Sequence, residues 1–151
     1  VDGLLDVHDY LDGRVDLSVR EIGPTDVSVA GFDVSATRMD HSVDCLAYRF
    51  SGGDGDIVYS GDGEASASLA SFADGAAVLA HDCSFPDDVD VSSHPTPSQL
   101  GGVLSGHDFG RVYLTHLYPH TEGRHDEMLE SIARSYDGEV RFARDGLRVE
   151  V

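Results

Sequence analysis

The sequence feature that most constrains the fold is a strand followed by a helix, repeated three times in the second half of the chain. Short apolar stretches predict the strands, and apolar residues at helical spacing predict the helices. The predicted pairs are strand 56–59 with helix 66–72, strand 76–80 with helix 97–107, and strand 111–115 with helix 122–136. Three such units imply a layered α/β sheet.

The chain before these units reads mainly as β-structure. Alternating apolar residues, interrupted at Gly23-Pro24 and Gly31, predict strands at 15–22, 27–30, 32–39 and 44–50. A last hairpin is predicted around Asp145-Gly146, with strands at 139–143 and 147–151. With 151 residues the chain fits one domain, residues 1–151. We therefore expect an α/β (α+β) fold with a β-rich first part.

The second predicted helix has the clearest start signal. Thr96 can be its N-cap, Pro97 stands at the first helical position, and Gln99 stands where a capping box requires Glu or Gln. Leu100 and Leu104 then form an apolar face. We interpret such residues as core and not as a cofactor site.

The charge balance is strongly acidic, with 28 acidic residues against 10 basic ones and a net charge of -18. The acids are dispersed among alternating apolar positions, so they do not indicate disorder. We expect a halophilic, cytoplasmic protein without a membrane segment, because molar salt screens this self-repulsion over about 3 Å. Such a surface disfavours binding of nucleic acid at ordinary salt.

Cys45 and Cys83 do not form a disulfide framework and are interpreted as small buried residues.

Metal-capable side chains stand at the ends of all three predicted strands. Asp62 follows the first strand, His81 and Asp82 end the second, and His116 ends the third. In open α/β sheets ligands bind at the carboxyl ends of the strands. We therefore expect these side chains to meet at one edge.

Two further histidines belong to the same pattern. His94 lies just before the second helix, and His41 follows the strand that ends at Met39. Each residue taken alone is most simply a turn, capping or hydrogen-bonded structural group. Together they supply the imidazoles and carboxylates that bind Zn²⁺ and similar divalent ions.

A family resemblance rests on five motifs in chain order. They are Asp40-His41-Ser42-Val43-Asp44-Cys45-Leu46-Ala47-Tyr48-Arg49-Phe50, Ile57-Val58-Tyr59-Ser60-Gly61-Asp62, His81-Asp82-Cys83-Ser84-Phe85, His94-Pro95-Thr96 and Leu114-Thr115-His116-Leu117. They resemble the later motifs of metallo-β-lactamase-fold hydrolases, most closely those of the tRNase Z-like branch. The resemblance covers roughly residues 15–120.

The resemblance implies a role for each of the five site residues. His41 would ligate one metal ion, His116 the second, and Asp62 would bridge both. His94 would donate a proton to the leaving group, positioned by Asp82. Two divalent ions, Zn²⁺ first and Mn²⁺ second, would activate a hydroxide that attacks a phosphodiester or another ester. The alternative is a metal-free module that retains the fold and binds a partner.

The chain departs from the family pattern in three ways. The upstream His-x-His-x-Asp-His cluster of the family is absent from these residues, and Asp82 stands where Glu is usual. We therefore expect the C-terminal part of a four-layer αββα fold, inactive as an isolated chain, with an exposed apolar sheet face or edge. Only residues 51–56 separate two strands where the branch carries its tRNA-gripping arm. A small-molecule or nucleotide ester is thus expected as substrate in place of tRNA, and a homodimer is expected by resemblance.

The charge pattern predicts that stability rises with salt. The melting temperature should increase between low and molar KCl, because the screening length falls from about 10 Å at 0.1 M to about 3 Å at 1 M. Thermal unfolding followed by circular dichroism measures this dependence. A melting temperature that does not rise would contradict the halophilic interpretation.

Overall fold

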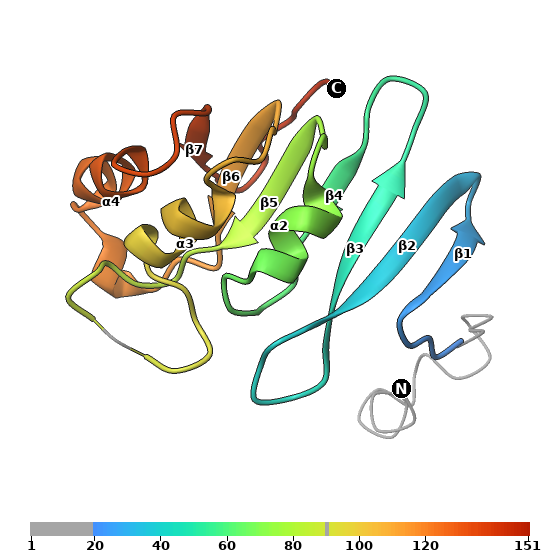
Figure 1. Ribbon diagram of the computed structural model, residues 1–151, viewed down its shortest axis with the longest axis horizontal. Helices are drawn as coiled ribbons and strands as arrows, with labels where there is room; N and C mark the ends of the chain where they lie inside the picture. The colour runs from blue at the N-terminus through green and yellow to red at the C-terminus, as the bar shows by residue number, and fades with distance from the viewer. Residues whose placement is uncertain (1–19, 90) are drawn as a thin grey trace, which may run out of the picture.

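A seven-stranded mixed sheet is the frame of the molecule (Figure 1). The structure is a computed structural model that describes residues 20–89 and 91–151. The strands are β1 (Thr25–Val29), β2 (Phe32–Met39), β3 (Cys45–Ser51), β4 (Ile57–Tyr59), β5 (Val78–Asp82), β6 (Arg111–Thr115) and β7 (Val140–Phe142). Their order in the sheet follows the chain, with antiparallel pairing from β1 to β4 and parallel pairing from β4 to β7.

Helices connect the parallel strands and confirm the three predicted strand–helix units. They are α2 (Ala67–Ala73) after β4, α3 (Pro97–Leu104) after β5, and α4 (His125–Ala133) after β6, the last preceded by the short 3-10 helix η2 (Pro119–Thr121). Gln99 has the predicted capping role at the start of α3, because its Oε1 accepts a hydrogen bond from the backbone N–H of Thr96 at 2.9 Å. Among the described residues, no helix is long and apolar enough to cross a membrane.

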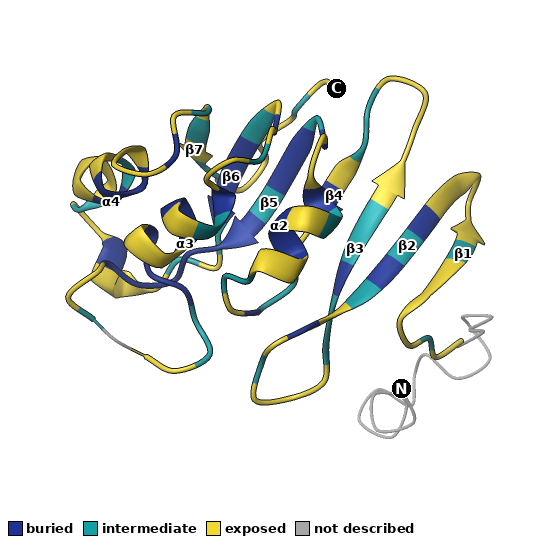
Figure 2. Cartoon of the chain, viewed as in Figure 1, coloured by how far each residue is buried: buried dark blue, intermediate teal, exposed yellow. Residues whose placement is uncertain are grey.

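The hydrophobic core lies between the three helices and one face of the sheet. The strands contribute every second residue to this core. The pairing of β4, β5 and β6 places these residues on the same face of the sheet, among them Val58, Leu79, Val112 and Leu114. The helices contribute side chains that include Leu69, Leu100, Leu104, Met128 and Ile132. Figure 2 shows these strand centres buried and the outer sides of the helices exposed. Each large apolar side chain stabilises the fold by about 1.5–3 kcal/mol when fully buried.

One glycine sets the spacing of the two helices that cover β5 and β6. A Cβ atom at Gly101 of α3 would lie 2.8 Å from the carbonyl oxygen of Ile132 in α4. Real Cβ atoms do not approach an oxygen that closely, so a side chain here would force the helices apart. Gly101 therefore keeps α3 and α4 in direct contact.

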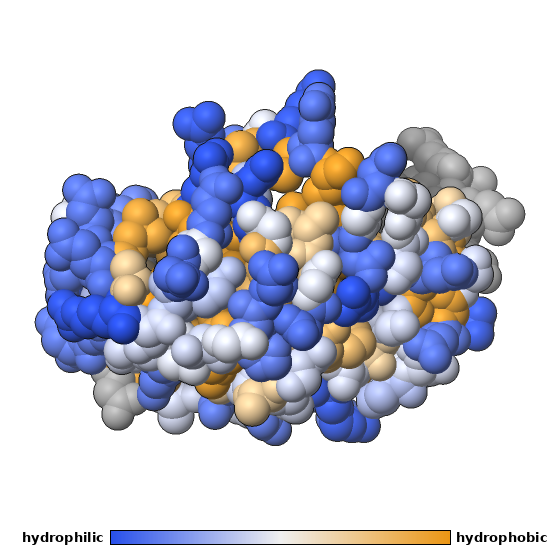
Figure 3. All heavy atoms as spheres, turned by 45° about the horizontal axis from the view of Figure 1, so that its top comes forward, coloured by the Kyte–Doolittle hydropathy of each residue, from blue (hydrophilic) through white to orange (hydrophobic). Residues whose placement is uncertain are grey.

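The opposite face of the sheet exposes apolar side chains. Phe50 and Ile57 are paired across β3 and β4, and they are 36% and 39% exposed. Tyr59 and Phe32 are exposed as well. Figure 3 shows apolar surface in patches among predominantly hydrophilic residues. The expected exposed apolar face is therefore present.

The predicted C-terminal hairpin is wrong. Strand β7 pairs with β6 in parallel, and residues 147–151 form no strand. The chain reaches β7 from helix α4, so the free edge of β6 accepts it in the parallel direction that the preceding units set. After the turn at Arg144, the tail leaves β7, and Val151 lines a hollow together with Phe50 and Ile57.

Other boundaries differ from the prediction by a few residues. The predicted helix 122–136 is shorter, because η2 and a turn at Glu122–Arg124 precede α4. The predicted helix 97–107 ends at Leu104, where Ser105 leaves the helical conformation. The predicted strand 15–22 lies largely outside the described residues, and residues 20–22 form no strand.

A half-buried arginine ties the antiparallel part of the sheet to the first helix. Arg49 of β3 donates through Nε to Asp56 Oδ2 at 2.6 Å. Its Nη1 donates to the carbonyl oxygens of Phe72 and Asp74, at 2.8 and 3.2 Å, at the end of α2. The hydrogen bond from Arg49 holds the pKa of Asp56 below its usual range. One side chain thus joins β3, the start of β4 and the C-terminus of α2.

We predict that Arg49→Ala lowers the free energy of unfolding by about 2 kcal/mol, because hydrogen bonds to charged groups each contribute about 1.5–3 kcal/mol. Urea unfolding followed by circular dichroism measures the loss. The contribution of Asp56 should be complete above the ordinary carboxyl pKa of about 3.9 and should disappear as the pH falls through the lower folded value.

Arg38→Ala is the matched control for this prediction. Arg38 also contacts an aspartate at 2.6 Å, Asp44, but the two side chains are 64% and 93% exposed. Exposed ion pairs contribute little, so this variant should lose less than about 0.5 kcal/mol. Equal losses in the two variants would contradict the role given to Arg49.

Candidate metal and catalytic site

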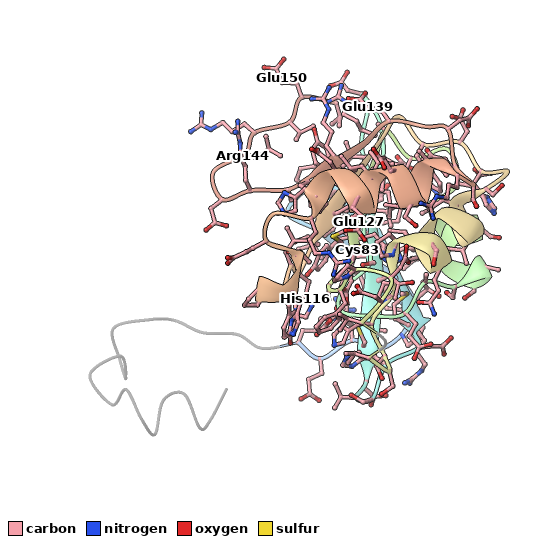
Figure 4. The ribbon with its side chains drawn as sticks, turned by 90° about the vertical axis from the view of Figure 1, so that its left-hand side faces the viewer. Cys83, His116, Glu127, Glu139, Arg144 and Glu150 are labelled. Carbon is pink, nitrogen blue, oxygen red and sulfur yellow. The ribbon has the colours of Figure 1, made fainter. Side chains whose placement is uncertain are left out.

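The predicted site residues meet at the carboxyl edge of the parallel strands. Asp62 follows β4, Asp82 ends β5 and His116 follows β6, so the three strands deliver them side by side. His94 joins them from the loop before α3. Figure 4 shows His116 at one end of the sheet, away from Glu139, which precedes β7 at the other end.

Four side chains form one compact set of metal-capable atoms. One nitrogen or oxygen from each of Asp62, Asp82, His94 and His116 lies within 4.8 Å of the others. Asp62 Oδ1 is 3.2 Å from His116 Nδ1 and 3.4 Å from His94 Nδ1. The His94 and His116 rings stack with their centres 5.3 Å apart. Residues from four segments of the chain therefore converge on one point.

His94 and Asp82 form a direct pair. His94 Nδ1 lies 2.8 Å from Asp82 Oδ2, and the Asp82 side chain is fully buried. A carboxylate oxygen accepts, so Nδ1 carries the proton of this hydrogen bond. The shorter acid at position 82 therefore reaches the imidazole.

Burial and hydrogen bonds act in opposite directions on Asp82. Burial raises the pKa of this carboxyl group, while the hydrogen bonds from Ser84 and His94 lower it. The Ser84 hydroxyl donates to Asp82 Oδ1 at 2.5 Å, and the Asp82 backbone N–H donates to Ser60 Oγ at 3.1 Å. Asp82 is thus held at both its side chain and its backbone.

His41 lies beside the four-residue set and outside it. Its Nε2 is 3.9 Å from Asp62 Oδ2, and its ring centre is 5.7 Å from that of His94. Its Nδ1 accepts a hydrogen bond from the backbone N–H of Val43 at 3.3 Å. The five residues to which the family resemblance assigns a role therefore gather at one edge.

Two neighbours of Asp82 do not take part in the site. His81 points to the opposite face of β5, and burial lowers its pKa to about 4, so the ring is neutral. Burial also raises the pKa of the Cys83 thiol, and the charges of Asp82 and Asp87 add to this effect. Cys83 is free and buried, and Cys45 is free and half-buried.

The backbone at His116 is in an unusual conformation. Its φ angle is +57°, in the left-handed region that non-glycine residues seldom occupy. The Ser84 hydroxyl lies 2.8 Å from the carbonyl oxygen of this residue. The turn after β6 aims the imidazole at Asp62.

The donor set fits divalent metal ions. Asp62 Oδ1 is buried and has no hydrogen-bond partner among the described residues. Such an atom costs about 1–3 kcal/mol unless something else satisfies it. Two carboxylates and two or three imidazoles are the ligands that Zn²⁺ and Mn²⁺ accept. The four side chains therefore form a candidate site for a divalent metal ion.

Ser84 is the site residue that the motif analysis overlooked. It is fully buried and contacts both Asp82 and His116. Its spacing from Asp82 could have indicated this role, because in an extended chain the side chains of residues two positions apart point to the same side. Serine alone carries no metal or acid–base signal, so its position was the only indication.

Comparison with known proteins finds related sequences among metallo-hydrolases and ribonucleases Z. YhfI of Bacillus subtilis, described as a probable metallo-hydrolase, is 31% identical over 117 residues, which are 76% of this chain and 47% of YhfI. Ribonuclease Z of Haloferax volcanii is 31% identical over 99 residues, 63% of this chain and 31% of that enzyme. No family model matches the sequence. The chain spans about half the length of YhfI and about a third of this ribonuclease Z.

The structural comparison agrees. The crystal structure of YhfI, a metallo-β-lactamase-fold protein, superposes with a TM-score of 0.75 at 26% identity, over 83% of this chain and 52% of YhfI. The order of strands and helices, the converging site and the related sequences all point to one family. This chain has the metallo-β-lactamase fold, and its sequence is similar to that of a probable metallo-hydrolase and to that of a ribonuclease Z.

Proposed function

We propose that the protein is a metal-dependent hydrolase that cleaves phosphodiester or other ester bonds. The observation that carries this proposal is a set of four side chains whose metal-capable atoms lie within 4.8 Å of one another. In the part of the chain that the structure describes, Asp62 Oδ1 has no hydrogen-bond partner. Similarity to a metallo-hydrolase and to ribonuclease Z supports it. Zinc is the ion that this donor set favours, with manganese second.

Three residues would hold the ions. Asp62 offers two carboxylate oxygens between His41 and His116 and is suited to bridge two ions. His41 and His116 would each serve one of them. Bound divalent ions stabilise negative charge on the reacting oxygens and lower the pKa of water.

His94 and Asp82 would handle the proton of the leaving group. Asp82 accepts Nδ1–H of His94, so the proton available for transfer is the one on Nε2 of the doubly protonated ring. The carboxylate also stabilises the charge of that ring and fixes its orientation. Asp82 is therefore the positioning partner and His94 the proton donor.

The substrate we propose is a small-molecule or nucleotide ester. Strands β3 and β4 are joined by the short segment 52–56, which has no room for an RNA-gripping insertion. Cleavage of bis(4-nitrophenyl) phosphate with no cleavage of precursor tRNA would support this class. The reverse would contradict it.

We further propose a cytoplasmic, salt-adapted protein that forms homodimers.

We predict that Asp62→Ala abolishes hydrolysis in the full-length protein and lowers its metal content, because one carboxylate would serve both ions. Metal analysis by mass spectrometry and turnover of bis(4-nitrophenyl) phosphate measure the two effects. Wild-type turnover would remove Asp62 from the site. Absence of Zn²⁺ and Mn²⁺ from the wild-type protein would favour the alternative of a metal-free, partner-binding module.

His94→Ala should have a different signature. We expect turnover to fall by about 10²–10⁴-fold, as for the loss of a general acid, with the metal content nearly unchanged. The same two measurements decide the matter. A loss of metal as large as that of Asp62→Ala would identify His94 as a ligand and not as the proton donor.

A further inference from the structure

The buried hydroxyl of Ser84 has more partners than a serine ordinarily satisfies. The three short contacts of its Oγ are with Asp82 Oδ1 at 2.5 Å, the carbonyl oxygen of His116 at 2.8 Å and His116 Nδ1 at 2.8 Å. His94 Nδ1, which donates to Asp82, lies farther from it at 3.5 Å. The residue is 0% exposed, so water does not compete for these contacts. The three contacts together determine where the protons lie.

A serine hydroxyl has one proton to donate and two lone pairs that accept. The Asp82 carboxylate and the His116 carbonyl oxygen can only accept, so they share the single proton of Ser84. The third neighbour, His116 Nδ1, must then be the donor. The neutral His116 ring therefore carries its proton on Nδ1 and leaves the lone pair on Nε2.

We propose that Ser84 is a positioning residue that selects this tautomer of His116 and prepares Nε2 as a metal ligand. Metal-bound histidines almost always donate their other ring N–H to an acceptor, which fixes the ring and its tautomer. Here the acceptor is a hydroxyl that is itself anchored on Asp82. Ser84 thereby connects the proton-donor pair, His94 and Asp82, with the metal ligand His116. This inference rests on the proposed function.

The test reads the tautomer directly. Long-range ¹H–¹⁵N correlation spectra of the ¹⁵N-labelled protein, recorded without metal at mildly alkaline pH, distinguish Nδ1–H from Nε2–H imidazoles. His116→Gln assigns the signal. We expect the Nδ1–H form in the wild type, and a shift toward Nε2–H, the form that free histidine favours in water, in Ser84→Ala.

Matched variants separate this role from a purely structural one. Ser131→Ala also removes a buried serine hydroxyl that donates to a carboxylate, that of Asp87, and it should leave the His116 tautomer unchanged. Ser84→Thr keeps the hydroxyl and should preserve the wild-type tautomer. If Ser84→Ala does not fold, Ser84→Cys supplies a side chain of similar size with a weak acceptor. An Nε2–H ring in the wild type, or an unchanged ring in the folded Ser84 variants, would overturn the proposal.

Zn²⁺ titration of the full-length protein adds a second measurement. Outer-shell partners of this kind change metal affinity by about 10–100-fold, so Ser84→Ala should bind Zn²⁺ that much more weakly than the wild type. A changed tautomer with equal Zn²⁺ affinity would overturn the metal part of the proposal. A changed tautomer with no Zn²⁺ binding in either protein would support the Ser84–His116 contact and count against the proposed function.

Discussion

The site depends on one buried carboxylate. Asp82 ends a central strand, its side chain has no access to water, and a charge in that place is tolerated only when every oxygen is satisfied. Ser84 bonds to one oxygen and His94 to the other, and Ser60 holds the backbone. These demands fix the position of each neighbour more tightly than packing alone does. Asp62 differs, because one of its oxygens is buried and accepts no hydrogen bond from residues 20–89 or 91–151.

The sheet is organised so that this cluster can exist. Parallel pairing from β4 to β7 puts the ends of successive strands at one edge, and the helices cover one face only. The antiparallel strands β1 to β3 extend the sheet, and Arg49 links them to helix α2. His41 lies in the turn between β2 and β3. Its side chain reaches the cluster because this turn lies at the same edge of the sheet as the ends of the parallel strands. Two differently built halves of one sheet thus supply a single site.

Local patterns were sufficient to predict most of the architecture and the location of the site. The strand–helix alternation, the capping residues around Thr96 and the polar residues at strand ends depend on neighbours in sequence, and the structure agrees with them. The C-terminal hairpin was wrong because a turn signal at Asp145-Gly146 says nothing about which strand edge is free. Ser84 was overlooked because its importance lies in contacts 32 residues away along the chain. Strand pairing and hydrogen bonds between residues far apart in the chain cannot be predicted from short stretches of sequence.

The left-handed backbone at His116 has an evolutionary consequence. A residue other than glycine held in this conformation costs on the order of 1 kcal/mol, which the surrounding contacts must offset. Selection for stability alone would favour glycine or asparagine at this position, whereas the proposed metal site would require an imidazole. Under the proposed function, position 116 is therefore a point of conflict between stability and activity. A lineage that lost the activity would be free to relax this turn, so the residue found there in any descendant records whether the site is still under selection.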